Sequence, residues 1–215
     1  MKTYVIGNSI VRELTDSGWT TICLPGADWS AIVHYVTLHR ESLANSIIYV
    51  HIGPVRFTRL TNRHECVLRS RYIDDPPTLF RSWRSLIQSH NIIPVICTIY
   101  PMDFDRYNEH LKSKRNSHHI RQDLYSDYNK RIKGMAVVEN QKITDFNVYN
   151  KMATPYMHKR VFTRRRHAYS FCDRFLVDGL HPSKIVIDDW IREIKRVNEI
   201  NTAELSKRNC NSNKH

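Results

Sequence analysis

Runs of β-branched and other apolar residues alternate along this chain with longer segments of helical periodicity, and this alternation constrains the fold more than any other feature. The runs are apolar throughout rather than at every second residue, which is typical of strands buried on both faces of a parallel sheet. Parallel strands are joined by helices through right-handed crossovers. The sequence therefore predicts an α/β fold with a five-stranded parallel sheet.

The apolar patterns also predict where the elements begin and end. The predicted strands are Tyr4 to Gly7, Thr20 to Leu24, Ser46 to Ile52, Ile92 to Ile99 and Met135 to Val138. The predicted helices are Val11 to Ser17, Ser30 to His39, Pro77 to Ser89, His118 to Ile132 and Ser183 to Ile200. Residues 140–178 lack a long apolar period, so we expect them to form a surface excursion.

Length and composition suit a single domain. A chain of 215 residues, 41% of them hydrophobic, is long enough to bury a core without a metal or a disulfide. We expect one domain over residues 1–200 and a flexible polar tail over residues 201–215, with no internal repeat. The five cysteines form no C-x-x-C pair, and no histidine group has the spacing of a metal site, so we expect neither a metal nor another cofactor.

The chain has no apolar run near the roughly 20 residues that a membrane-spanning helix needs. Its N-terminal apolar run is also too short for a signal peptide. We therefore expect an intracellular protein, cytoplasmic or nuclear, without a transmembrane segment.

A serine follows the first predicted strand, in Gly7-Asn8-Ser9. Ligands of parallel sheets bind at the carboxyl ends of the strands, so this turn would expose the Ser9 hydroxyl where chemistry is expected. The alternative is that Asn8 or Ser9 caps the next helix.

An aspartate and a histidine stand together near the other end, in Asp178-Gly179-Leu180-His181-Pro182-Ser183. By itself this segment also reads as a turn followed by a helix start. Together with Ser9, however, His181 and Asp178 supply the nucleophile, the base and the group that orients the base. The sequence thus offers one complete Ser-His-Asp set.

A glycine follows the second predicted strand, in Leu24-Pro25-Gly26-Ala27. Its backbone N–H can approach a substrate oxygen closely, and the N-terminus of the helix that follows favours negative charge. Gly26 is therefore a candidate donor to an oxyanion.

With these blocks the sequence resembles the SGNH/GDSL hydrolase superfamily. Gly7-Asn8-Ser9 matches its Gly-Asp-Ser nucleophile block, Gly26 its oxyanion glycine, and Asp178 to Ser183 its Asp-x-x-His block. Val95 to Pro101 and the helix with Tyr128-Asn129 are similar to its fourth strand and the helix before its fifth. The resemblance implies a flavodoxin-like three-layer α/β/α sandwich and hydrolysis of ester bonds without a metal.

The third block departs from the superfamily pattern. In place of Gly-x-Asn-Asp the chain has Gly53-Pro54-Val55-Arg56, so Val55 stands where the superfamily has an asparagine that donates to the oxyanion. The remaining donors implied by the resemblance are the N–H groups of Ser9, Gly26 and Gly53. Loss of one donor typically costs about 10² to 10³ in rate. The Arg56 guanidinium is a hypothetical replacement.

The charge is strongly positive, +12 from 33 Lys and Arg against 21 Asp and Glu, and the surplus lies mainly in segments 51–71 and 151–166. Such segments favour an anionic substrate or a polyanion such as RNA or DNA, although solvated loops are the alternative interpretation. The candidate anion-binding residues are Arg56, Arg59, Arg63, Lys159, Arg160, Arg164, Arg165 and Arg166. The run 164–166 is also similar to a nuclear localisation signal.

Two functions remain. The first is a serine esterase that uses Ser9, His181 and Asp178, with an ester substrate that carries negative charge. The second is a catalytically degenerate domain that binds RNA or DNA, for which the superfamily has precedent. The complete Ser-His-Asp set favours the first, and Val55 together with the basic charge favours the second.

Overall fold

The computed structural model describes residues 1–52, 58–60, 66–68, 76–99, 107, 130–131, 157–163, 166–171 and 176–212. Four parallel strands form its central sheet, in the order β2-β1-β3-β6. They are β1 (Lys2–Gly7), β2 (Thr20–Cys23), β3 (Ser46–His51) and β6 (Ile92–Ile96). All six residues of β3 are buried, as the apolar run at this position predicts.

The strand order is that of a flavodoxin-like sheet, in which the chain begins in the middle and reverses direction between β2 and β3. The fold class predicted from the sequence, a three-layer α/β/α sandwich, is confirmed by this sheet and its helices. The predicted fifth strand, Met135 to Val138, lies outside the described residues. So does the predicted helix His118 to Ile132, except for residues 130–131, which are helical.

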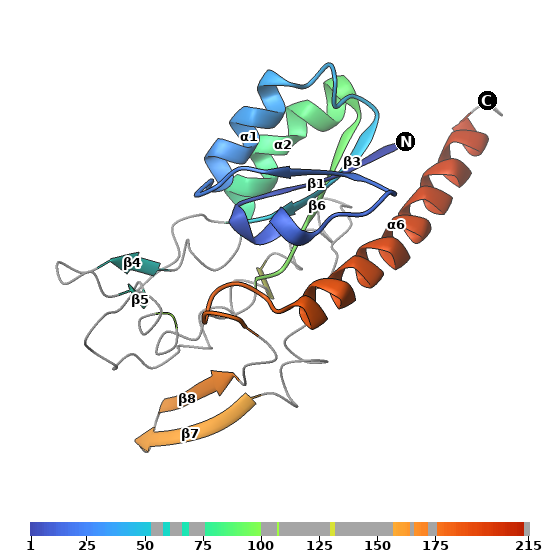
Figure 1. The fold of residues 1–215 in the computed structure, drawn as a ribbon. Coiled ribbons are helices and arrows are strands. Elements are labelled where there is room, and N and C mark those ends of the chain that lie inside the picture. The colour runs from blue at the N-terminus through green and yellow to red at the C-terminus, as the bar shows by residue number, and fades with distance from the viewer. Residues whose placement is uncertain are drawn as a thin grey trace.

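Helices cover the sheet on both faces (Figure 1). Helices α1 (Trp29–Leu38) and α2 (Pro76–His90) lie on one face, where the Trp29 and Trp83 rings pack with centroids 5.8 Å apart. Helix α6 (Lys184–Ser212) lies on the other face, where Asn198 accepts a hydrogen bond of 3.0 Å from Thr3 of β1. No helix in the described part of the chain is long and apolar enough to cross a membrane.

The element after β1 differs from the prediction. The sequence predicts a helix over Val11 to Ser17, but the chain forms a short 3-10 helix, η1 (Ser9–Glu13). The reason lies just beyond it, where the Asp16 side chain accepts a hydrogen bond of 2.9 Å from the Gly18 N–H and stabilises a turn. Such a side-chain acceptor competes with helical hydrogen bonds, so the helix ends early.

Helix α6 is longer than predicted. The sequence predicts an end at Ile200 and a polar tail from residue 201, whereas the helix continues to Ser212. Residues 201–212 contain neither glycine nor proline and include the strong helix formers Ala203, Glu204 and Leu205. Polarity alone was therefore a poor guide to the end of this helix.

Within the described ranges, two antiparallel hairpins lie outside the central sheet. One pairs β4 (Thr58–Leu60) with β5 (Cys66–Leu68), and the other pairs β7 (Met157–Thr163) with β8 (Arg166–Phe171). The sequence predicts no strand in either segment, which is wrong for these residues. Basic residues interrupt the β-branched and aromatic ones here, and that hides the strand pattern.

Candidate active site

Ser9 lies directly beyond β1, at the carboxyl edge of the sheet. Gly7, the last residue of β1, lies so close to β3 that a Cβ atom on it would be 2.2 Å from the His51 carbonyl oxygen and 2.6 Å from Val11 Cγ1. Real Cβ atoms never approach that closely, so only glycine fits. The glycine before the predicted nucleophile is thus required by packing.

The capping alternative and the chemical alternative apply to different residues. Buried Asn8 is the cap of η1, because its Oδ1 accepts a hydrogen bond of 3.1 Å from the Ile10 N–H. Its Nδ2 donates to the Ile52 carbonyl oxygen, just beyond β3. This second bond was not predicted from the sequence. Its signal was Asn8 itself, which stands where the Gly-Asp-Ser block has an aspartate, because an amide can donate a hydrogen bond and a carboxylate cannot. Asn8 therefore leaves the Ser9 hydroxyl free for another partner.

That partner comes from the turn that precedes α6. Leu176 and Pro182 pair as an antiparallel bridge, and the chain between them turns at Gly179, whose φ is 86°. Within the turn Asp178 Oδ1 accepts hydrogen bonds from the Leu180 N–H (2.9 Å) and the His181 N–H (2.7 Å). Asp178 Oδ2 lies 2.7 Å from His181 Nδ1.

Burial by itself would raise the pKa of the Asp178 carboxyl. The hydrogen bonds from the His181 amide and imidazole and from the Leu180 amide outweigh burial and lower the pKa below its usual value. Asp178 is therefore a fixed carboxylate that accepts the proton on His181 Nδ1. In a neutral imidazole held in this way, the lone pair is at Nε2.

His181 Nε2 lies 3.4 Å from Ser9 Oγ. This distance is somewhat longer than the 2.6 to 3.2 Å of a tight pair of nucleophile and base, a difference that binding of substrate commonly closes. The three residues form a continuous chain from carboxylate to imidazole to hydroxyl, although 169 positions separate Ser9 from Asp178. Such a chain can take a proton from the hydroxyl and stabilise the imidazolium that results.

Gly26 lies beyond β2, the strand next to β1. The segment Leu24 to Ala27 has the features of a type II turn, since the Ala27 N–H donates to the Leu24 carbonyl (2.9 Å) and Gly26 has a φ of 71°. The turn's hydrogen bond uses the Ala27 N–H and leaves out that of Gly26. Ser9 is the first residue of η1, so its N–H has no acceptor within the helix. Both candidate donors thus follow adjacent parallel strands.

The remaining predicted site residues fall into two groups. Gly53, Val55, Arg56, Arg63, Arg164 and Arg165 lie outside the described residues. Arg59 belongs to β4, Lys159 and Arg160 to β7, and Arg166 to β8. The side chains of these residues also lie outside the described part of the structure, so their role in anion binding stays a prediction.

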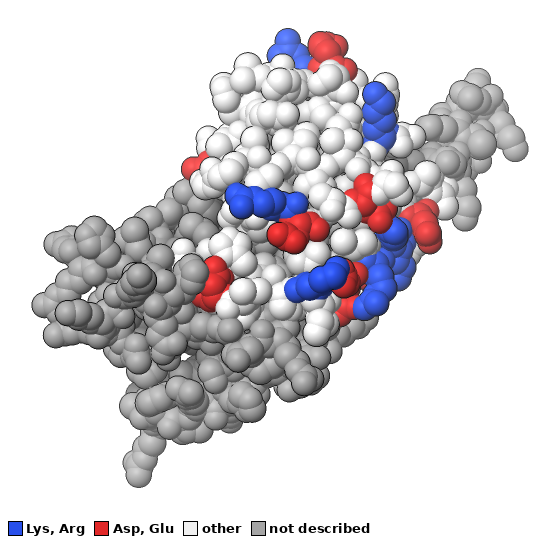
Figure 2. All heavy atoms as spheres, viewed as in Figure 1, with Lys and Arg blue, Asp and Glu red and all other residues white. Residues whose placement is uncertain are grey.

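The described body, meaning all residues whose side chains the structure describes, carries little net charge. Its described side chains include eleven Lys or Arg and nine Asp or Glu, and Figure 2 shows both signs interspersed on the visible face. Several of these groups are paired, such as Lys195 of α6 with Asp16 at 2.7 Å. Most of the +12 surplus therefore belongs to the other segments of the chain.

Comparison with known proteins supports the same fold. No family model and no curated protein matches this sequence. Among solved structures, a protein from Bacteroides fragilis assigned as an acylhydrolase superposes with a TM-score of 0.60 at 11% identity, over 93% of this chain and 87% of the other. A GDSL-like lipase from Bacteroides thetaiotaomicron gives a TM-score of 0.56 at 13% identity, over 93% and 88%.

An acetyl xylan esterase has a TM-score of 0.56 with 15% identity, over 92% of this chain and 99% of its own. At such low identity the likeness concerns the fold alone. The chain has the fold of SGNH/GDSL hydrolases, as the sequence blocks predict.

Proposed function

We propose that this protein is a serine esterase, with Ser9 as nucleophile, His181 as general base and Asp178 as the residue that orients His181. The observation that carries this proposal is the hydrogen-bonded chain from Asp178 Oδ2 to His181 Nδ1 (2.7 Å) and from His181 Nε2 to Ser9 Oγ (3.4 Å). Its position at the carboxyl edge of the parallel sheet supports the proposal. So does a fold shared with acylhydrolases and esterases.

In the first half of the reaction Ser9 Oγ attacks the ester carbonyl carbon while His181 Nε2 takes the hydroxyl proton. The carbonyl oxygen becomes an oxyanion, to which the N–H groups of Ser9, Gly26 and Gly53 donate. His181 then gives the proton to the alkoxy oxygen, the alcohol departs, and the acyl group stays bonded to Ser9 Oγ. In the second half His181 takes a proton from water, the water oxygen attacks the acyl carbon, and the proton returns to Ser9 Oγ as the acid is released.

The substitution of Val55 for the superfamily's asparagine predicts a slow enzyme. One missing oxyanion donor costs about 10² to 10³ in rate, which lowers turnover without abolishing it. Replacement of Val55 by asparagine should then raise the rate of hydrolysis.

We further propose an ester that carries negative charge, because the basic segment with Arg56, Arg59 and Arg63 directly follows the third strand.

Labelling with a fluorophosphonate probe tests the esterase proposal directly. Such probes react only with an activated serine, so the wild type should be labelled and Ser9→Ala should not. Ser42→Ala is a matched control, because Ser42 is an exposed serine whose hydroxyl donates to the His39 carbonyl. Absence of labelling in the wild type, or equal labelling of the Ser9→Ala variant, would overturn the proposal.

A second candidate, nucleic-acid binding, is favoured by the location of the charge. The described body is nearly neutral, and Lys159, Arg160 and Arg166 belong to a hairpin apart from the central sheet. A basic ribbon of this kind contacts phosphates, and its affinity falls steeply with salt. This function does not require Ser9 to react.

The test for this candidate is the binding of a single-stranded RNA, followed by fluorescence anisotropy over a range of salt concentrations. Replacement of Arg164, Arg165 and Arg166 by alanine should weaken binding and flatten its salt dependence. The matched control removes three positive charges from α6, at Lys184, Arg192 and Arg196, each of which is paired with a neighbouring acid. Equal losses in the two triple variants would rule out a specific role for the hairpin.

A further inference from the structure

The turn that carries Asp178 and His181 also places an apolar side chain beside the imidazole. Leu176 and Pro182 are directly paired in antiparallel fashion, and the Val177 N–H donates to the His181 carbonyl oxygen at 2.8 Å. Val177 and His181 therefore follow the bridged pair across the turn and are joined by this one backbone hydrogen bond, while the His181 N–H donates to Asp178 Oδ1 (2.7 Å). Residues that continue a bridge in this way carry their side chains on the face opposite to that of the bridged pair.

Burial follows the alternation that this pairing demands. Leu176 is completely buried and Pro182 is also buried, so their face of the turn packs on the core. Val177 is 60% exposed and the His181 side chain 40% exposed, so the opposite face is open to solvent. An exposed valine is common on protein surfaces, but this one shares its open face with the base of the proposed reaction.

The chemistry of the base determines which part of a substrate would meet Val177. His181 Nε2 gives its proton to the alkoxy oxygen as the alcohol leaves, so that oxygen must come within hydrogen-bonding distance of the imidazole. The carbon atoms attached to the same oxygen then lie beside His181, on the open face of the turn. The acyl group, bonded to the carbon that Ser9 attacks, lies on the other side of the reacting bond.

We propose that Val177 forms an apolar wall of the leaving-group subsite and favours esters whose alcohol is apolar next to the oxygen. This inference rests on the proposed esterase function and adds the side of the substrate that the turn recognises. Contact with Val177 removes apolar surface of the alcohol from water, which strengthens binding in proportion to the area covered.

The experiment measures kcat/KM by pH-stat titration for methyl acetate and hexyl acetate. Replacement Val177→Ser should lower the preference for the hexyl ester about three- to tenfold, since a few methylene contacts are worth this much. Val177→Ile should retain the preference, which excludes a merely structural effect. The matched control Leu38→Ser changes another exposed apolar residue, at the end of α1, and should behave as the wild type.

A second series varies the acyl group, from p-nitrophenyl acetate to p-nitrophenyl hexanoate. The Val177→Ser variant should keep the wild-type preference in this series. The inference alone would be overturned if Ser9-dependent hydrolysis persisted but Val177→Ser left the alcohol preference unchanged or changed the acyl preference equally. The proposed esterase function would be overturned if no variant hydrolysed any ester in a Ser9-dependent way. The inference would then fail as well.

Discussion

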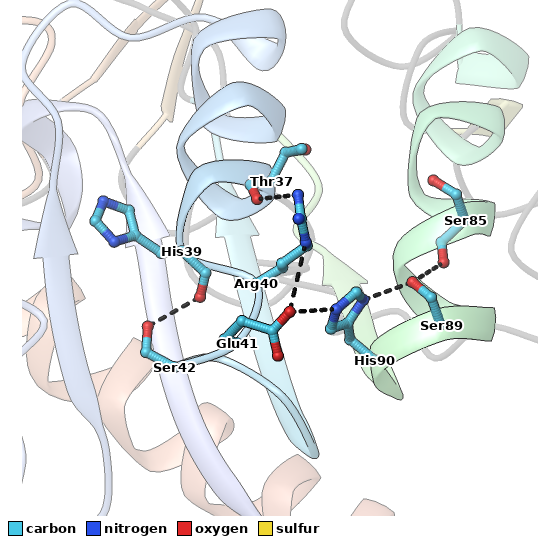
Figure 3. A network of polar contacts seen from close by, with 8 residues as sticks. All are labelled: Thr37, His39, Arg40, Glu41, Ser42, Ser85, Ser89 and His90. Atoms are coloured by element: carbon cyan, nitrogen blue, oxygen red, sulfur yellow. Dashed lines mark hydrogen bonds and ion pairs between the residues drawn. The ribbon is translucent and has the colours of Figure 1, made fainter.

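The described part of the molecule contains two clusters in which a histidine stands between a serine and a carboxylate. In one, His181 lies between Ser9 and Asp178 at the carboxyl edge of the sheet. In the other, His90 Nδ1 lies 2.5 Å from Ser89 Oγ, and His90 Nε2 lies 3.2 Å from Glu41 Oε1 (Figure 3). The second cluster joins the end of α2 to the segment after α1, near the points where β6 and β3 begin.

The carboxylates of the two clusters differ in how firmly they are held. The Asp178 side chain is 12% exposed and accepts two backbone N–H groups of its own turn. The Glu41 side chain is 83% exposed and shares its oxygen with the neighbouring Arg40 at 3.7 Å. Only Asp178 can hold an imidazole in one tautomer and one orientation, because only Asp178 is itself fixed.

The serines differ in where their protons go. Ser89 Oγ donates to the Ser85 carbonyl oxygen at 2.7 Å, within α2. Its single proton is thus committed, and Ser89 meets His90 as an acceptor. Ser9, in contrast, has His181 Nε2 at 3.4 Å as the acceptor for its proton, and it lies at the edge where ligands of such sheets bind. Short distances between the same three residue types therefore do not by themselves define an active site.

Replacement of the carboxylates should separate the clusters most sharply. In Asp178→Asn the oxygen that accepts the two backbone N–H groups can be kept only if the NH2 group of the amide faces His181 Nδ1. An NH2 group cannot accept the Nδ1 proton, so His181 no longer holds the tautomer in which Nε2 acts as a base. We expect the rate of p-nitrophenyl acetate hydrolysis to fall by about 10³ to 10⁴. Glu41→Gln makes the same chemical change in the other cluster and should leave the rate unchanged. Similar rates in the two variants would contradict the distinction between the clusters.

A third histidine extends the comparison into the core. His51 is buried at the end of β3, with its ring 5.3 Å from that of Trp190, and burial lowers its pKa to about 4. Between pH 6.5 and 4 the unfolded chain binds a proton at His51 that the folded chain does not. The free energy of unfolding should therefore decrease as the pH falls through this window, by about 3 kcal/mol at most.

Urea denaturation at pH 7 and pH 4.5 measures this loss. A His51→Phe variant should show a smaller decrease between the two pH values, whatever its stability at pH 7. An identical decrease in the variant would mean that other groups cause the acid sensitivity.

The weakest effect is expected for the His90 cluster itself. Glu41 is almost fully exposed, and ion pairs of this kind contribute less than about 1 kcal/mol to stability. Glu41→Gln should lower the free energy of unfolding by no more than this, and the difference should shrink at high salt. A loss of several kcal/mol that is insensitive to salt would show that the second cluster is a major structural link.

The elements that could be predicted are those whose signal is local. The four described strands of the sheet are continuous apolar runs, and the matches of Gly7, Ser9 and Asp178 to their blocks are readable directly. Helix ends were harder to predict. The turn at Asp16 depends on a side-chain hydrogen bond, and the continuation of α6 to Ser212 depends on helix propensity rather than on polarity. The hairpins were missed because charge masked their strand pattern.

The residue types for proton transfer are present in the sequence, and their blocks point to one superfamily fold. Sequence alone, however, left open whether Asn8 or Ser9 caps the next helix and whether Ser9, His181 and Asp178 lie in contact. Only the tertiary structure decided these questions, because it determines which hydroxyl proton is already committed and which carboxylate is buried and held by backbone N–H groups. It also placed Val177 across the turn from His181, a relation set by strand pairing that no spacing along the chain expresses.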